Sequence, residues 1–280
     1  MTEPTGDYAR ALNQHYGRLG LGDAILAGLV ASGHDPDALT PDALAPVDQF
    51  HIRGKDATLE LAGLAGLSAG TRVLDVGGGL GGAARTLAAE LGCRVTVLDL
   101  TEEYCRVGED LTRRAGLAER VSFRHGNALA LPFPDASFDA AWTQHSSMNV
   151  PEKPRLYAEI ARAVRPGGRV AIHEIMAGAS APVHFPVPWA REPATSFLSP
   201  TDAVRTLVRG AGLRELAWLD VSGPSLEWFR QRLAAPGGSG PPPLGFHLLL
   251  GADFGPMFRN MARNLEEDRI RVIQGVWERD

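Results

Sequence analysis

One stretch constrains the fold of this chain more than any other: an apolar run that leads directly into a cluster of glycines, Thr71-Arg-Val-Leu-Asp-Val-Gly-Gly-Gly-Leu-Gly-Gly82. Val73, Leu74 and Val76 give the run the character of a buried strand, and a helical pattern begins at Ala83. Glycine is needed in such a turn because the backbone visits φ/ψ values that a side chain would forbid. The order of strand, glycine turn and helix also brings backbone N–H groups close to a ligand at the electropositive start of a helix. The sequence therefore predicts an α/β fold with a ligand-binding turn at this point.

A second predicted strand supports this interpretation. The segment Gly92-Cys-Arg-Val-Thr-Val-Leu-Asp-Leu100 ends in Asp99, 20 residues after Gly79, where a carboxylate can accept hydrogen bonds from two ribose hydroxyls. Dinucleotide-binding turns usually read G-x-G-x-x-G, whereas this turn reads Asp75-x-Gly77-x-Gly79, with an acidic residue inside the strand. That pattern resembles motif I of the class I S-adenosylmethionine (SAM) methyltransferases, in which the loop faces a methionine moiety. The prediction is therefore SAM as the ligand rather than NAD.

The composition of the chain limits its partners. With 280 residues, 44% of them hydrophobic, the chain can form one large core or one core and a small cap. The net charge is −5 and the only lysines are Lys55 and Lys153. Nucleic acid is therefore not expected as a partner, because its binding rests on clustered cationic side chains. A small-molecule acceptor is expected instead, and a homodimer stays open.

Cysteine usage and the terminal sequence predict the location. Cys93 and Cys105 have no metal-ligand spacing and are expected to be free thiols in a reducing compartment. The polar N-terminal segment lacks the pattern of a signal peptide. No apolar run approaches the ~18 residues that a membrane span requires. The prediction is a cytoplasmic protein that does not act at a membrane.

The middle of the chain alternates between strand-like and helix-like segments, as in a doubly wound sheet. The predicted strands are Arg72–Val76, Arg94–Asp99, Val121–His125, Phe138–Trp142, Arg169–Ile175, Leu213–Val221 and Ile270–Trp277. The predicted helices are Gly82–Leu91, Glu102–Ala115, Lys153–Val164, one that follows an N-cap at Ser199 with Pro200 in its first position, Ser225–Leu233, and Leu248–Leu265 with an interruption near Gly255-Pro256. Ligands bind beyond the carboxyl ends of the strands in such sheets. The segments that follow the first four strands should therefore meet at one site.

The front of the chain precedes the sheet and is a candidate lid. Residues 7–33 have the spacing of two helices with a break at Gly20 and Gly22, a Pro- and Asp-punctuated connector follows over 36–46, and a helix is predicted from about Lys55 to Leu67. The predicted division is a helical lid over residues 1–60 and a SAM-binding core over 61–280, with substrate cap segments around 178–200 and 223–268. Within the second cap segment, residues 235–243 are the most linker-like stretch.

Three further segments resemble a narrower group. They are Asp48-Gln-Phe-His-Ile-Arg-Gly54, Trp142-Thr-Gln-His145, and Asn264-Leu-Glu-Glu-Asp-Arg269 before the last strand. With them the chain resembles the sarcosine/dimethylglycine N-methyltransferase-like group of class I SAM methyltransferases. The resemblance implies a Rossmann-like doubly wound sheet of seven strands, mostly parallel with an antiparallel last strand. It also implies an N-terminal helical lid and a helical cap before that strand.

The resemblance assigns residues to the cofactor, which would be SAM with S-adenosylhomocysteine as product. It implies that Asp75, Gly77 and Gly79 hold the methionine part and that Asp99 holds the ribose. The remaining expected cofactor contacts are Leu100, Asn127 and Ala128 around the adenine, Gln144 near the sulfonium, and Tyr16 and His51 from the lid. Asn127 departs from the Asp that is usual at its position, and Gly78 from the usual small non-glycine residue.

Methyl transfer from a sulfonium requires mainly that acceptor, methyl and sulfur be aligned. No metal-ligand cluster is apparent in the sequence, and no metal is expected. Gln144 and His145 are the catalytic candidates, with His145 as the proton acceptor for a secondary amine or a hydroxyl. Trp142 and Trp189 are candidates for contact with a cationic acceptor or product, and Arg53 and Arg191 for an acceptor carboxylate.

Three hypotheses for function follow. The first is N-methylation of a glycine derivative, as the resemblance implies. The second is O-, N- or C-methylation of a larger, more apolar acceptor in specialised metabolism, which the aromatic His184–Trp189 segment and the apolar Leu244–Leu250 segment favour. The third is a module that binds SAM or S-adenosylhomocysteine without catalysis, since a fold does not guarantee an activity.

Overall fold

The computed structural model describes residues 15–17, 19–234 and 242–280. The helices are α2 Leu21–Ala31, α3 Pro41–Asp48, α4 Gly54–Ala65, α5 Gly82–Leu91, α6 Glu102–Arg114, α7 Lys153–Ala163, α8 Thr201–Gly210, α9 Ser222–Ala234, α10 His247–Leu250 and α11 Phe254–Glu266. The strands are β1 Arg72–Val76, β2 Arg94–Asp99, β3 Val121–His125, β4 Phe138–Gln144, β5 Val164–Ala177, β6 Leu213–Asp220 and β7 Ile270–Arg279. The predicted helix before Gly20 lies mostly outside these residues, and so does the linker-like stretch up to residue 241.

The strands form one seven-stranded sheet in the order β3-β2-β1-β4-β5-β7-β6. Strands β1 to β5 pair in parallel, whereas β7 is antiparallel to both of its neighbours. This confirms the predicted Rossmann-like sheet with an antiparallel last strand. The strand order reverses between β1 and β4, and the carboxyl ends on either side of that point are where such sheets bind ligands.

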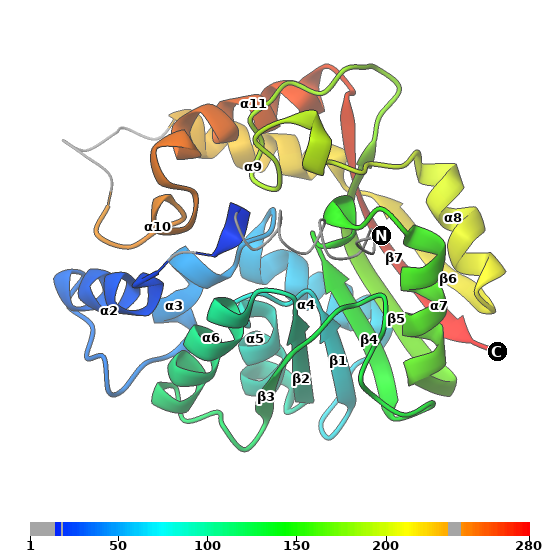
Figure 1. Ribbon diagram of the computed structural model, residues 1–280, viewed down its shortest axis with the longest axis horizontal. Coiled ribbons are helices and arrows are strands. Elements are labelled where there is room, and N and C mark those ends of the chain that lie inside the picture. Colours follow the sequence, from blue (N-terminus) through cyan, green and yellow to red (C-terminus); the bar gives the residue numbers. More distant parts are fainter. Residues whose placement is uncertain (1–14, 18, 235–241) are drawn as a thin grey trace, which may run out of the picture.

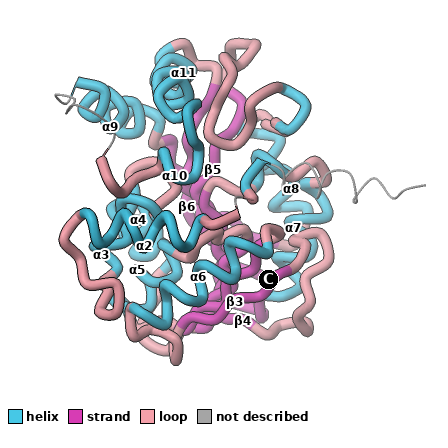
Figure 2. The backbone as a smooth tube through the Cα atoms, turned by 60° about the vertical axis from the view of Figure 1, so that its left-hand side comes forward, coloured by secondary structure: helices cyan, strands magenta, loops and turns pink. Residues whose placement is uncertain are grey.

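Helices cover both faces of the sheet because successive strand residues point to opposite sides. In β1, Leu74 and Val76 join the cluster formed by α7 and α8, whereas Val73 joins the cluster formed by α4 and α5. A strand that is buried on both faces reads as a continuous apolar run, which is what the sequence shows before the glycines. Figure 2 shows the strands between α4 and α5 on one side and α7 and α8 on the other.

A second layer of helices lies over the carboxyl ends of the parallel strands. Figure 1 shows α9, α10 and α11 above these ends, with α2 and α3 beside them. Helix α2 packs on α6 and on α10 through one apolar cluster, and α9 and α11 pack on β5 and β7 through another. The front of the chain and the segment before the last strand therefore enclose the same space.

The structure corrects three details of the sequence-based prediction. The connector over 36–46 contains a helix, α3, which begins at a Thr40 cap that accepts from the Ala43 N–H and has Pro41 in its first turn. Helix α8 begins at Thr201, with Pro200 as the cap residue in place of Ser199. The break in the long C-terminal helix falls over residues 251–253, so that Gly255 lies in the first turn of α11.

A buried ion pair fastens α3 to the sheet layer. The Arg85 guanidinium of α5 lies 2.7 Å from Asp48 Oδ2, and both side chains are almost fully enclosed. Arg85 also donates to the carbonyl oxygens of Leu80 and Gly108 and to the Thr112 hydroxyl. Gly82 permits this close approach, since a Cβ atom there would lie 2.3 Å from the Asp48 carbonyl oxygen.

We expect Asp48→Leu to lower the free energy of unfolding by about 3–5 kcal/mol, because it leaves a buried guanidinium without a counter-charge. Urea unfolding followed by circular dichroism measures the change. Glu103→Ala, which removes the partner of the largely exposed Arg106, is the matched control and should cost less than about 1 kcal/mol. The double variant Asp48→Leu/Arg85→Met should recover much of the loss. A cost for Asp48→Leu no larger than that of the control would contradict this account.

Candidate active site

A large cavity lies beyond the carboxyl ends of β1 to β4. It holds about 1430 Å³ of free space when its opening to solvent is included. Its floor comes from the segments after these four strands, which include the glycine turn, Asp99 to Thr101, Gly126 to Ala128, and Gln144 to Ser146. The predicted convergence of these segments is therefore observed.

The glycine turn forms one wall of the cavity. Gly77 and Gly79 have φ angles of 76° and 56°, in the left-handed region that favours glycine. A Cβ atom on Gly78 would lie 2.5 Å from Asp75 Oδ2 and 2.9 Å from Val97. Gly78, a departure from the family pattern, is therefore required by the close packing of this turn against Asp75.

Two carboxylates lie beside the turn. Burial, and secondly the charge of Asp99, raise the pKa of Asp75 to about 7. Asp75 Oδ2 is buried and has no hydrogen-bond partner in the described part of the chain. Asp99 accepts from the Gly79 N–H at 2.9 Å and from the Thr101 N–H at 2.8 Å, and burial raises its pKa as well. A carboxylate oxygen can accept more than one hydrogen bond, so Asp99 retains capacity for a ligand.

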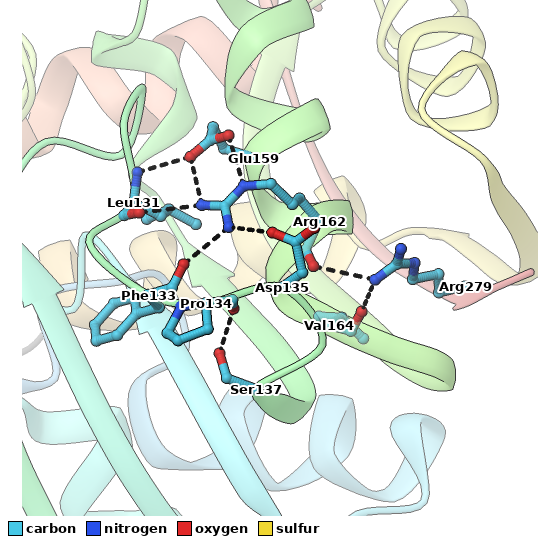
Figure 3. Close-up of polar contacts among 9 residues, drawn as sticks. All are labelled: Leu131, Phe133, Pro134, Asp135, Ser137, Glu159, Arg162, Val164 and Arg279. Carbon is cyan, nitrogen blue, oxygen red and sulfur yellow. Dashed lines mark hydrogen bonds and ion pairs between the residues drawn. The ribbon is translucent and has the colours of Figure 1, made fainter.

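The loop after β3 forms the opposite side of the cavity floor. The Asn127 side chain accepts from the Leu129 N–H at 2.9 Å, and Asn127 and Ala128 line the cavity together with Leu100. Figure 3 shows how Arg162 of α7 holds the continuation of this loop. Its guanidinium donates to the carbonyl oxygens of Leu131 and Phe133 and pairs with Asp135 and Glu159. Helix α7 thus fixes the position of this loop through Arg162.

Gln144 and His145 stand at the end of β4. The Gln144 Oε1 accepts from the Trp142 indole at 2.9 Å and from the Thr58 hydroxyl at 3.2 Å. The next residue, His145, has a φ of 51°, and backbone of this kind in a non-glycine residue is costly and found often at functional sites. The Ser146 and Ser147 N–H groups donate to the buried Glu174 carboxylate of β5, which holds the turn after His145 in place.

Three imidazoles gather beside Gln144. The ring centroid of His145 lies 4.7 Å from that of His173 and 6.3 Å from that of His51. Burial lowers the pKa of all three, to about 4 for His51 and well below the ordinary value for His145 and His173. The imidazoles are therefore neutral at pH 7, and His51 and His145 line the cavity.

The cover of the cavity is mostly apolar. Tyr16 donates its hydroxyl to Asn149 Oδ1 at 2.9 Å, and Trp189 donates its indole N–H to the Ser196 hydroxyl; both side chains line the cavity. We call the following residues the apolar roof: Phe50, Trp228, Phe229, Phe246, Leu249, Phe258 and Met261. Several of their rings contact one another, as in the pairs Phe50–Phe246 and Phe229–Phe258.

Three residues predicted to contact the substrate do not line the cavity. Trp142 is completely buried in the core between the sheet and α5, because β4 continues to Gln144 and places Trp142 inside the sheet. Arg53 points to Glu60 of α4, with which it forms an ion pair. Arg191 forms an ion pair with Asp253 at 2.9 Å. The structure therefore does not place these three side chains at this cavity, and their contact with a substrate stays a prediction.

Sequence reasoning also missed several cavity residues. Asn149 and Thr101 lie in segments that were recognised as strand ends but were not singled out. The apolar roof was indicated only by the apolar stretch over 244–250. A further signal is the spacing of Phe254, Met257, Phe258 and Met261, which places apolar side chains on one face of a helix.

The cavity fits the cofactor that the resemblance implies. The unpartnered carboxylate oxygen of Asp75 suits the ammonium group of SAM, and Asp99 can accept from ribose hydroxyls. No group of three or more His, Cys, Asp or Glu side chains in the described ranges is arranged to hold a metal ion. None of the helices described is long and apolar enough to cross a membrane. Cys93 and Cys105 are both buried free thiols.

Part of the chain is similar to known methyltransferases. A protein-family profile described as methyltransferase domain matches residues 74–172, the range that contains the glycine turn, Asp99, Asn127 and Gln144. Methyltransferase GfsG of Streptomyces halstedii is 36% identical over 171 residues, which cover 61% of this chain and 57% of that protein. Glycine/sarcosine/dimethylglycine N-methyltransferase of Actinopolyspora halophila is 38% identical over 136 residues, which cover 49% of this chain and 24% of that protein. The chain therefore spans less than two thirds of either relative.

Solved structures agree on the fold. Geranyl diphosphate C-methyltransferase from Streptomyces coelicolor A3(2), in complex with S-adenosylhomocysteine, superposes with a TM-score of 0.67 and 17% identity, covering 99% of this chain and 100% of that one. This structure thus shares its fold with the chain described here, and residues 74–172 are similar to a methyltransferase domain, as the sequence pattern indicated. Other relatives are named as a sterol 24-C-methyltransferase, a tocopherol O-methyltransferase and a 27-O-demethylrifamycin SV methyltransferase. Their names span carbon and oxygen acceptors, so they do not determine the acceptor of this chain.

We expect Asp75→Asn to stabilise the ligand-free protein and to weaken SAM binding. The raised pKa means that the folded state favours the neutral carboxyl. Below pH 3.8 the carboxyl is protonated in both the folded and the unfolded state, so Asp75 does not lower the stability there. Above about pH 7 it is ionised in both states, and its full destabilising effect is reached. Asparagine removes this cost, which is at most about 4 kcal/mol at pH 8. Thermal unfolding at pH 8 and at pH 5 should show a gain that is smaller at the lower pH.

The same variant should lose roughly 10- to 100-fold in SAM affinity by isothermal titration, as expected when a hydrogen bond to a charged group is lost. Asp23→Asn, on α2 outside the cavity, is the control, and neither property should change by more than about 0.5 kcal/mol. Unchanged SAM affinity in Asp75→Asn would remove this carboxylate from the cofactor site.

Proposed function

We propose that this protein transfers a methyl group from SAM to an apolar small molecule that is larger than a glycine derivative. The observation that carries this proposal is the lining of the cavity. Of the described residues that line it, none is Lys or Arg, whereas its cover is the apolar roof. This favours the second of the three sequence-based hypotheses over the first.

An amino-acid acceptor requires a partner for its carboxylate. Buried carboxylates are normally paired with cations or with several N–H donors. The two arginines suggested for this role, Arg53 and Arg191, form ion pairs with Glu60 and Asp253 and do not line the cavity. No cationic side chain of the described lining is therefore available to pair with an acceptor carboxylate. Glycine derivatives are therefore poor candidates, and a diphosphate is disfavoured for the same reason.

The apolar roof supplies what a larger acceptor needs. Its aromatic and aliphatic side chains line the cavity from α9, α10 and α11, from Phe50 after α3 and from Phe246 just before α10. Burial of apolar surface contributes about 25 cal/mol per Å², so a polycyclic, prenyl or macrocyclic skeleton can bind there without charged contacts.

The residues of this chain act mainly by positioning. When bound, SAM supplies an activated methyl group on a sulfonium. We assign Asp75 to its ammonium group, Asp99 to its ribose, and Leu100, Asn127 and Ala128 to its adenine. Gln144, held by the Trp142 indole and the Thr58 hydroxyl, forms the wall between the cofactor and the acceptor. Alignment of reacting groups in this manner can supply ~7–11 kcal/mol of barrier reduction, and the lid and roof exclude water from the reaction.

Further parts of the sequence-based account remain predictions. These are the division into a lid over residues 1–60 and a core over 61–280, a cytoplasmic location, a homodimer, and independence from metal. A module that binds SAM without catalysis is the remaining alternative in a different class. Turnover with any acceptor excludes it.

The proposal is tested by titration with SAM and S-adenosylhomocysteine, followed by a screen for S-adenosylhomocysteine formation. One set of candidate acceptors contains sarcosine and dimethylglycine. A second set contains apolar compounds, namely sterols, prenylated phenols and macrolides, each with hydroxyl, amine or alkene groups as the reactive position. Turnover confined to the second set is the expected result. Turnover of sarcosine alone would restore the glycine-derivative hypothesis, and failure to bind SAM would reject the function altogether.

We expect variants of the residues assigned to the cofactor and of the apolar roof to separate SAM binding from acceptor binding. Phe246→Ala should raise KM for the apolar acceptor about 10-fold or more, since truncation of a buried aromatic contact typically costs more than about 1 kcal/mol, and should leave SAM affinity unchanged. Asp99→Ala should weaken SAM binding by a similar factor. Titration with SAM and steady-state kinetics with the acceptor measure both. If Phe246→Ala left KM unchanged, the roof would not be the acceptor site.

A further inference from the structure

The two ring nitrogens of His51 differ in protonation. Its Nε2 lies 3.0 Å from the Gly54 carbonyl oxygen and 3.0 Å from the Thr58 hydroxyl. A carbonyl oxygen can only accept, so Nε2 carries the proton and Nδ1 of the neutral ring carries a lone pair. No hydrogen bond within the described ranges uses that lone pair, and the ring lines the cavity. Since burial lowers the pKa of His51 to about 4, the lone pair is available at neutral pH.

The loop that carries His51 is built to hold this state. Arg53 and Gly54 both have positive φ angles, 68° and 51°, which turn the chain back on itself. The Gly54 N–H donates to the His51 carbonyl oxygen at 3.2 Å, while the Gly54 carbonyl oxygen accepts from the His51 ring. Backbone in this region persists for a non-glycine residue only when its surroundings enforce it. The His51 ring is therefore held in one orientation, and its Nδ1 takes no part in the hydrogen bonds of this loop.

His145 is in the opposite situation. The Ile52 N–H donates to its Nδ1 at 3.4 Å, which uses the lone pair of the neutral ring and leaves the proton on Nε2. His173 is similar, because the Trp142 indole fixes the orientation of the Gln144 amide, whose NH₂ group then faces His173 Nδ1 at 3.4 Å. Both rings therefore present an Nε2–H, which is a donor. His145, the proton acceptor predicted from the sequence, lacks a free lone pair for that role.

We propose that the acceptor is an alcohol or a phenol on an apolar skeleton, and that His51 Nδ1 accepts the proton which its hydroxyl group loses on methylation. The inference rests on the proposed function and deepens it. In the reaction the oxygen–carbon bond forms as the carbon–sulfur bond of the sulfonium breaks, and the electron pair of that bond stays on sulfur. The O–H bond breaks and its proton moves to Nδ1, which gives an imidazolium that later releases the proton to solvent.

A hydroxyl group matches the lining of the cavity better than an ammonium group does. Its hydrogen can be donated to the Nδ1 lone pair while the oxygen keeps lone pairs for attack on the methyl group. A protonated amine has no lone pair for attack until it loses its proton. Asp75 and Asp99, whose carboxylates would suit such a cation, are those assigned to the cofactor. An otherwise apolar molecule with one hydroxyl group can therefore donate to His51 Nδ1 while its skeleton packs against the apolar roof.

Two matched variants separate His51 from His145. His51→Gln keeps an N–H group for the Gly54 carbonyl oxygen but has no basic nitrogen, and His145→Asn keeps an oxygen for the Ile52 N–H. We expect His51→Gln to lower kcat for a hydroxyl acceptor by about 10²–10⁴-fold with SAM affinity within about threefold of the parent, and His145→Asn to stay within about tenfold. The reverse ranking would overturn the proposal. Methylation of apolar amines or alkenes but of no hydroxyl compound would overturn it as well, and would leave the proposed function standing.

The state of the ring can be measured without any acceptor. Long-range ¹H–¹⁵N NMR of protein labelled with ¹⁵N-histidine, in complex with S-adenosylhomocysteine at pH 7, distinguishes a protonated nitrogen from a bare one. The signal that disappears in His51→Gln belongs to His51 and should show a protonated Nε2 and a bare Nδ1. A protonated Nδ1 would overturn the proposal whatever the outcome of the activity measurements.

Discussion

The candidate site depends on the contact between a buried carboxylate and the glycine turn. Asp75 can stand where it does only because Gly78 has no side chain, and the turn in turn presents the Gly79 N–H to Asp99. Burial, and secondly the charge of Asp99, raises the cost of ionising Asp75. Folding alone does not favour this arrangement. It becomes favourable when a cation is bound, which explains why a protein would retain an unpartnered carboxylate oxygen at the centre of its sheet.

The front of the chain is fastened to this site by polar contacts that are themselves buried. The Asp48–Arg85 pair joins α3 to α5, and the Tyr16 hydroxyl reaches Asn149 after β4. His51 lies three residues after Asp48, in a loop whose Ile52 N–H donates to His145 Nδ1. Closure of the cavity and the state of its imidazoles are therefore consequences of the same packing. A displacement of the lid would release the His145 lone pair as well as open the cavity.

Much of the cofactor side could be predicted from the sequence because its determinants are local. The glycine turn, Asp99 and Asn127 each follow a strand whose apolar pattern marks its end, and parallel strands bring such ends together. Trp142 does not line the cavity because its strand extends two residues further than the pattern indicated, which moves the indole from the edge of the sheet into its interior. Arg53 and Arg191 do not line it either, and their ion-pair partners, 7 and 62 residues away, cannot be identified from spacing alone.

The residues around the proposed acceptor site could not be predicted from the sequence for a related reason. The matched methyltransferase profile covers residues 74–172. It therefore includes the residues assigned to the cofactor but neither His51 nor the apolar roof. Those parts come from a segment before the first strand and from helices just before the last one, and they meet only in the folded chain. Relatives of this chain are named for nitrogen, carbon and oxygen acceptors. Under the inference drawn above, the choice of acceptor atom in this chain depends on which imidazole keeps a free lone pair. That is decided by two backbone groups of the lid, the Gly54 carbonyl oxygen and the Ile52 N–H.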